Sequence, residues 1–212
     1  MKRFKNVVSL NYDLIPYWAM LRGNEEISCT WFKDGFINNS GREFAGDIEF
    51  LRRPHGNCNG STILFYPHGN LILAQENGVN EIKLRRTAAD DLLEIVLRFW
   101  KIGFHVPLFV SEGTSEKKKE AINRSRYLNT VYHEILPKME KSLVIYGWSM
   151  GAQDEHILRE LAACNLEKIA VSVNSGGNRG DAYCQRVTQK LRDIGAKKID
   201  FFRAGSEGCW IY

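Results

Sequence analysis

Three short polar sequences follow apolar segments and carry residue types that chemistry needs. They are Asn11-Tyr12-Asp13, His68-Gly69 and the five residues from Gly147 to Gly151. The unperturbed pKa of histidine lies near neutral pH, so His68 suits the role of a general base. If the preceding segments are strands of one parallel sheet, all three sequences follow the carboxyl ends of strands, where α/β proteins bind ligands. We therefore place the candidate reaction centre around Asn11, Asp13 and His68.

The segments before these sequences are predicted strands. Residues 4–10 mix β-branched and apolar residues and stop at the turn-forming Asn11. Residues 62–66 are a short apolar run, typical of a strand that is buried on both faces. Residues 143–146 form a third apolar run, which Gly147 ends. These three strands must position the polar residues.

The remaining pattern alternates between helix and strand. Helices are predicted over residues 87–103, 154–164 and 181–194, strands over 106–110, 168–174 and 199–202, and a helical region, broken near Pro137, over about 115–141. Thr87 and Asp90 have the spacing of a variant capping box. The alternation predicts an α/β fold with a doubly wound, mostly parallel, Rossmann-like sheet. We expect one domain over residues 1–212, with an irregular or hairpin insertion at about 23–60.

The composition indicates an ordinary globular protein. Hydrophobic residues make up 44% and charged residues 25%, and no apolar run is long enough to span a bilayer. The N-terminus lacks the apolar core of a secretion signal, so a cytoplasmic location is expected. The net charge of +4 is spread along the chain apart from Lys117-Lys118-Lys119, which we interpret as a solvated helix face. Binding to nucleic acid or to a membrane is therefore not expected.

The five cysteines are odd in number and widely spaced: Cys29, Cys58, Cys164, Cys184 and Cys209. They form no Cys-x-x-Cys pair, and the histidines do not cluster with them at the spacing of metal ligands. The pattern predicts reduced thiols in a reducing compartment and no metal site.

The polar sequences resemble motifs of Sir2-like NAD-consuming domains. Residues 9–13, Ser-Leu-Asn-Tyr-Asp, resemble their Thr-x-Asn-Tyr-Asp motif, and residues 66–69, Tyr-Pro-His-Gly, resemble their catalytic His-Gly motif. Residues 144–150 resemble the Gly-x-Ser turn that receives a nucleotide ribose. Residues 110–115 and 147–157 also resemble a bacterial, DUF4917-type branch of these proteins. The motifs occur in family order across most of the chain.

The resemblance implies a Sir2-like fold, NAD as the substrate, and cleavage of the bond between nicotinamide and ribose. A role in phage defence is an extrapolation from the same resemblance. Cleavage of this bond gives an oxocarbenium-like ribose, which polar groups must orient while a base activates water. Asn11 would hold the nicotinamide ribose or the attacking water, Asp13 would orient the nicotinamide end, and His68 would be the base. The nucleotide-binding residues expected on the same ground are Gly69, Gly147, Ser149 and Asp154.

One departure from the family concerns the phosphates of NAD. Sir2-like domains have a strand and a glycine-rich loop before the Asn-Tyr-Asp motif, and that loop cradles the diphosphate. Residues 1–10 contain no glycine. We therefore expect a truncated Sir2-like domain that is a fragment, is completed by a partner or a second copy, or is a catalytically silent interaction module. Nothing matches the four-cysteine zinc module of Sir2-type deacetylases, so an NAD glycohydrolase is preferred to a deacetylase.

Two further interpretations remain open. Asn11 and Asp13 have the residue types that cap helices and turns. The sequence from Gly147 to Gly151 matches the Gly-x-Ser-x-Gly elbow of serine hydrolases, which would make Ser149 a nucleophile. The downstream histidine is His156, which the helix pattern places poorly for a catalytic triad.

Overall fold

The computed structural model describes residues 1–37, 42–76, 79–87, 90–103, 105–110, 113–174 and 178–209. The chain divides into two compact units, which are described one at a time. Unit 1 comprises Met1–Glu112 and Glu120–Val131, and unit 2 comprises Gly113–Lys119 and Tyr132–Tyr212. Within the described ranges, no helix combines the length and the apolar character that a membrane crossing requires.

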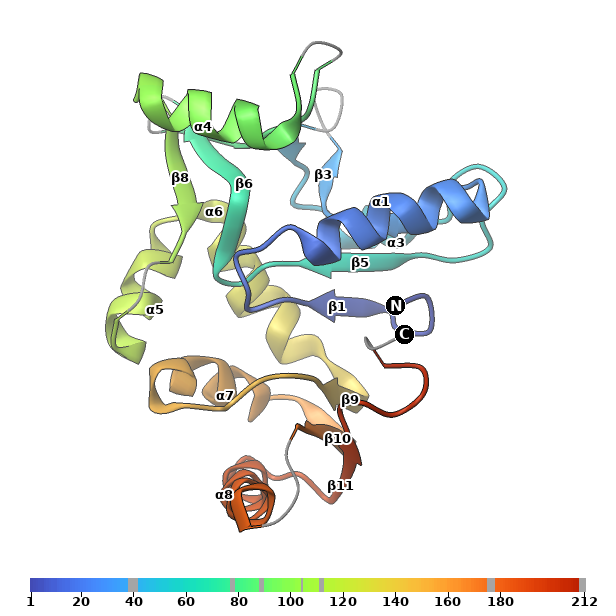
Figure 1. The fold of residues 1–212 in the computed structure, drawn as a ribbon, viewed down its shortest axis with the longest axis vertical. Coiled ribbons are helices and arrows are strands. Elements are labelled where there is room, and N and C mark those ends of the chain that lie inside the picture. Colours follow the sequence, from blue (N-terminus) through green and yellow to red (C-terminus); the bar gives the residue numbers. More distant parts are fainter. Residues whose placement is uncertain are drawn as a thin grey trace. The chain divides into compact units, whose positions relative to one another are not determined.

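Unit 1 contains a small parallel sheet with the strand order β1-β5-β2 (Figure 1). Its strands are β1 (Asn6–Val8), β5 (Thr62–Phe65) and β2 (Phe32–Lys33). Every residue of β5 is buried, and Val8 lies opposite Phe65 in the parallel register. Helix α1 (Ile15–Ile27) follows β1 and begins with a proline in its first turn, where the missing N–H costs nothing. The predicted strands at residues 4–10 and 62–66 are confirmed with shorter bounds.

A second sheet of unit 1 is antiparallel and has the order β3-β4-β7-β6-β8. Its strands are β3 (Phe36–Ile37), β4 (Glu43–Phe44), β7 (Asn80–Lys83), β6 (Gly69–Glu76) and β8 (His105–Phe109). The helices of unit 1 besides α1 are α3 (Ile48–Arg52), α4 (Leu92–Ile102) and α6 (Arg126–Thr130). Strand β6 follows β5 after a tight turn and pairs antiparallel with both β7 and β8.

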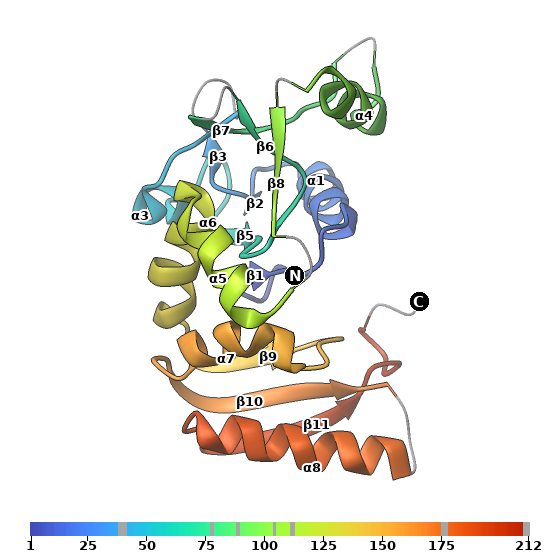
Figure 2. The same ribbon diagram turned by 90° about the vertical axis from the view of Figure 1, so that its left-hand side faces the viewer.

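Unit 2 contains a parallel sheet with the order β11-β10-β9. Its strands are β9 (Glu140–Ile145), β10 (Asn165–Val173) and β11 (Lys198–Arg203). Its described helices are η2 (Leu136–Lys138), η3 (Ala152–Asp154), α7 (Glu155–Leu161) and α8 (Asn178–Asp193). Two others cross between the units: α5 (Ser115–Asn123) begins in unit 2, and η1 (Val131–Ile135) begins at the last residue of unit 1. Figure 2 shows α8 running along β10 and β11. Val187 and Leu191 of α8 are fully buried in the core of this unit, together with Val171.

The fold is a mixed α/β fold, as predicted, but the expected mostly parallel sheet is not what the described residues form. They form two three-stranded parallel sheets and a five-stranded antiparallel sheet. The segment 106–110, predicted to join a parallel sheet, becomes β8 and pairs antiparallel with β6. The physical reason is that the chain turns at Pro67-His68 and starts β6 in a second sheet. β8 then pairs with β6 instead of joining the parallel sheet of β5.

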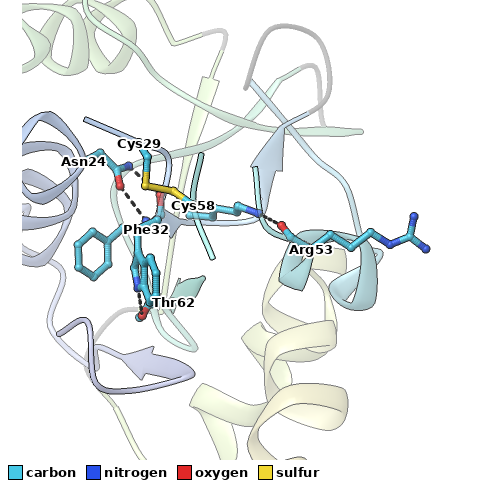
Figure 3. Close-up of a disulfide and its surroundings, with 8 residues drawn as sticks. Asn24, Cys29, Phe32, Arg53, Cys58 and Thr62 are labelled. Carbon is cyan, nitrogen blue, oxygen red and sulfur yellow. Dashed lines mark hydrogen bonds between the residues drawn. A yellow bond between two sulfur atoms is a disulfide. The ribbon is translucent and has the colours of Figure 1, made fainter. Parts of the chain in front are cut away.

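The prediction of reduced cysteines is wrong for one pair. Cys29 and Cys58 form a disulfide with a Cα–Cα distance of 5.8 Å, whereas Cys164, Cys184 and Cys209 are free (Figure 3). The bridge joins the segment after α1 to the segment before β5. The side chain of Asn24 exchanges two hydrogen bonds of 2.8 Å with the backbone of Phe32, which fixes the chain next to Cys29. A separation of 29 residues gives no sequence signal for this pairing.

The lysine run also needs a correction. Lys117 and Lys119 are exposed on α5, as predicted, but Lys118 is buried and pairs with Asp154 at 2.9 Å. The i and i+3 positions of a helix share a face, so Lys118 lies on the side of Ser115, which is also buried.

Candidate functional site

The structure brings two of the predicted polar sequences together in unit 1. Strands β1 and β5 are parallel neighbours, so their carboxyl ends meet at one edge of the sheet. Asn11 and His68 each lie three residues beyond the paired residues Val8 and Phe65. The backbone N–H of Leu71 donates to the carbonyl of Tyr12 at 3.1 Å, which ties the two loops to each other.

Val110, which follows β8, holds both loops as well. Its N–H donates to the carbonyl of His68 at 2.8 Å, and its carbonyl accepts from the hydroxyl of Tyr12. The segments around residues 12, 68 and 110 are therefore one hydrogen-bonded structure.

Asp13 and Asn11 differ in their surroundings. Asp13 is half-buried, and its Oδ1 accepts from the N–H of Ile15 at 2.9 Å, so it closes the turn that leads into α1, whose N-cap residue is Leu14. Asn11 is exposed, and its own N–H donates to Oγ of Ser9 at 3.3 Å. The turn engages one carboxylate oxygen of Asp13, and a carboxylate can accept at both.

Two side chains of the motif at residues 66–69 are buried, in contrast to the exposed Asn11. His68 and Tyr66 are each only 2% exposed. Burial raises the pKa of Tyr66 far above its usual value, and the negative charges of Asp34 and Asp13 raise this pKa further. The side chain of Asn70 lowers this pKa by more than either carboxylate raises it, although no hydrogen bond of good geometry reaches the Tyr66 hydroxyl among the described residues. A buried phenol that keeps its proton thus lies within the electrostatic reach of Asp13.

The backbone conformation and the packing at Gly69 both require glycine at this position. Its φ is +72°, and a Cβ at this position would lie 2.0 Å from the carbonyl oxygen of Leu108 in β8. The glycine of the His-Gly sequence is therefore required by the close approach of the two backbones.

The other predicted nucleotide-binding residues, Gly147, Ser149 and Asp154, belong to unit 2. Gly147 has φ +69°, and its N–H donates to Oγ of Ser172 at 2.9 Å. Ser149 is exposed at the end of this turn. Of the related residues 110–115, Ser111 and Glu112 lie outside the described residues.

Asp154 is buried, and two of its contacts are with side chains of unit 2. Its Oδ1 accepts from Nζ of Lys118 at 2.9 Å, and its Oδ2 accepts from Nε1 of Trp148 at 3.1 Å. The arrangement fixes the turn that carries Ser149, so Asp154 acts on that turn through Trp148.

The geometry around Ser149 differs from that of a hydrolase elbow. The nucleophile of an elbow lies on a strained turn, whereas the positive φ angles in this segment belong to Gly147 and Met150 instead of Ser149. His156 is 1% exposed within α7, and its Nδ1 lies 3.2 Å from Oγ of Ser115. Burial lowers the pKa of His156 to about 4.

Sequence reasoning missed the buried polar group of Ser115, Lys118, Asp154 and His156. Two spacings could have indicated it. Ser115 and Lys118 are three residues apart on one helix, which places them on one face. Asp154 and His156 flank the start of α7, the first at its N-cap and the second in its first turn. Among the described residues no three His, Cys, Asp or Glu side chains gather as a metal site would require.

No curated protein is significantly similar to this chain. A family model described as "Domain of unknown function (DUF4917)" matches residues 1–210, which include all seven predicted site residues. The chain therefore belongs to the DUF4917 family.

Proposed function

We propose that this chain is a Sir2-like, Rossmann-related domain that binds NAD and hydrolyses the bond between nicotinamide and ribose. The main support for the proposal is that two of the motif sequences lie together at one edge of a sheet. Asn11-Tyr12-Asp13 and Pro67-His68-Gly69 follow the carboxyl ends of the neighbouring strands β1 and β5. This is the edge at which α/β proteins bind nucleotides.

In the proposed reaction, the C–N bond to nicotinamide breaks and nicotinamide leaves with the bonding electrons, which neutralise its pyridinium charge. Water adds to the ribose carbon, and its proton passes to His68. Asn11 offers an amide that can orient the ribose or the water, and the charge of Asp13 favours the cationic sugar of the transition state. Within unit 2, we propose that Gly147 and Ser149 bind a nucleotide ribose, with Asp154 supporting their turn.

The diphosphate requires a further element in this proposal. β1 lies at the end of the strand order β1-β5-β2, so it has one strand neighbour among the described residues. We propose that a glycine-rich strand and loop, from a partner, a second copy or a further part of the protein, pairs with β1 and cradles the phosphates.

The test is nicotinamide release from NAD, followed by liquid chromatography. We expect release to fall at least about 100-fold in His68→Ala and in Asn11→Ala, as general bases and positioning groups contribute that much. His55→Ala is the matched control, because His55 also precedes a glycine but is exposed. Nicotinamide release that persists in a folded His68→Ala protein would contradict the assignment of His68 as the base.

Calorimetry with NAD separates the enzyme from a catalytically silent module. The burial of His68 favours the silent module as the second candidate, since a buried base is harder for a substrate to reach. Binding of NAD without release of nicotinamide would support that module, and an absence of both would remove NAD from the proposal.

A further inference from the structure

Helix α4 of unit 1 has one broad apolar face, and part of this face is exposed. Ile95 and Val96 are buried to 2% and 4% exposure where the helix packs on the unit, next to β8 (Figure 1). Roughly a third of a turn round the helix from them, Leu93, Leu97 and Trp100 are 48%, 54% and 37% exposed. Their spacing of four and three residues is the spacing of a helix seam. We call these three residues the α4 stripe.

A row of charged residues runs beside the α4 stripe, roughly a quarter of a turn round the helix. The acidic residues Asp90 and Glu94 lie toward its N-terminal end, and the basic residues Arg98 and Lys101 lie toward its C-terminal end. These four residues line an open hollow together with Leu97 and Ile102. Arg98 already pairs with Asp90 at 2.7 Å, whereas Lys101 forms no ion pair within the described part of the chain.

We propose that the α4 stripe is a self-association surface, on which α4 of a second copy of this chain packs antiparallel. A two-fold axis perpendicular to both helices and beside Leu97 keeps the two charged rows on the same side of the seam and reverses their direction. Glu94 of each copy then lies opposite Lys101 of the other. A parallel pair would place the rows on opposite sides of the seam, so the charge pattern selects the antiparallel dimer.

The size of the surface sets the expected affinity. One helix of 11 residues gives an interface below the size of stable dimers, so this contact belongs to the weak, transient class. Such weak contacts must be measured at high protein concentrations, of roughly 10 µM to 1 mM.

The first experiment is sedimentation equilibrium of the full chain over this range. We expect a monomer–dimer equilibrium for the unsubstituted chain and a loss of affinity of about 30-fold or more for Leu97→Glu, which places a charge at the centre of the seam. Leu21→Glu is the matched control, since Leu21 is an exposed leucine of α1 and its substitution should leave the equilibrium unchanged. Circular dichroism verifies that each variant is folded.

The second experiment uses charge reversal. Glu94→Lys and Lys101→Glu each place like charges opposite one another in a homodimer, so each variant should associate more weakly than the unsubstituted chain. An equimolar mixture of the two should recover association, because both facing pairs of residues 94 and 101 in the heterodimer have opposite charges. Recovery also answers the objection that Glu94→Lys weakens the start of α4, where Glu94 accepts from the N–H of Asp91.

Three results would overturn the proposal. They are a monomer at every concentration, unchanged association of Leu97→Glu, and a mixture that associates no better than its components. A monomer whose binding to phosphatidylglycerol vesicles is lost in Leu97→Glu would instead assign the α4 stripe to a membrane surface.

Discussion

The side chain of Ser115 makes two hydrogen-bond contacts with His156. Its Oγ accepts from the backbone N–H of His156 at 2.9 Å and lies 3.2 Å from the ring Nδ1 of the same residue. Since the first bond uses a lone pair of Oγ, the hydroxyl proton is available for Nδ1, which accepts it only when the ring is neutral there. The contact thus agrees with the low pKa that burial gives to His156.

This contact predicts a loss of stability in mild acid. The pKa of His156 is about 4 in the folded state and about 6.5 in the unfolded state, so the unfolded state binds the extra proton between these values. Stability is fully present above pH 6.5 and falls as the pH drops toward 4, by roughly 3 kcal/mol in total. Urea unfolding at several pH values measures this. In His156→Gln the dependence between pH 6.5 and 4 should flatten, and an equally steep dependence there would assign the effect to other groups.

The buried pair of Lys118 and Asp154 should respond strongly to the loss of one partner. Asp154→Ala leaves the ammonium of Lys118 buried without its carboxylate, which costs about 3–5 kcal/mol of unfolding free energy. The exposed pair of Lys198 and Asp200 is the control, and Asp200→Ala should change stability by less than about 1 kcal/mol. Equal effects of the two substitutions, measured by denaturant unfolding, would contradict the burial of Lys118.

Two glycines with nearly equal φ allow a matched comparison. Gly69→Ala meets the carbonyl oxygen of Leu108, whereas a Cβ on Gly147 meets no atom within 4 Å. Gly147→Ala should therefore cost only the strain of a positive φ, about 1–2 kcal/mol. Gly69→Ala should cost clearly more, because the backbone of β6 or β8 must move. Thermal unfolding measures both, and a smaller cost at Gly69 would show that the two strands are not so close.

The predictable parts of the fold are those in which local pattern and burial agree. The apolar run of β5 and the amphipathic pattern of α4 are examples, and α4 does end at Gly103 in a left-handed cap. The predicted start of this helix, residue 87, lies before the observed start at Leu92. Oγ1 of Thr87 does accept from the N–H of Asp90, but the capping box that begins the helix consists of Asp91 and Glu94. The hairpin of β6 and β7 was missed, since its apolar residues do not alternate.

The part of the candidate site that could be predicted is the proximity of the motif sequences that follow β1 and β5. Two motif sequences that follow strands share an edge only if the strands are parallel neighbours, and β1 and β5 are. The sequence could not reveal that His68 is buried or that its backbone bonds to the distant residue Val110, because both depend on how separate segments pack. It could not reveal the partners of Asp154 either, since Lys118 comes from another helix.

The disulfide offers a prediction on which sequence and structure disagree. Cys29→Ser should destabilise the oxidised protein by about 3–4 kcal/mol, because the bridge closes a loop of roughly 30 residues and so restricts the unfolded chain. Cys184→Ser is the control, since Cys184 is a free thiol and its removal should change little. A reductant should lower the stability of the unsubstituted chain to that of Cys29→Ser and leave Cys29→Ser unchanged. Titration with a thiol reagent in denaturant, without reductant, should count three thiols. A count of five, with equal stability in both redox states, would show that Cys29 and Cys58 remain reduced as the sequence predicts.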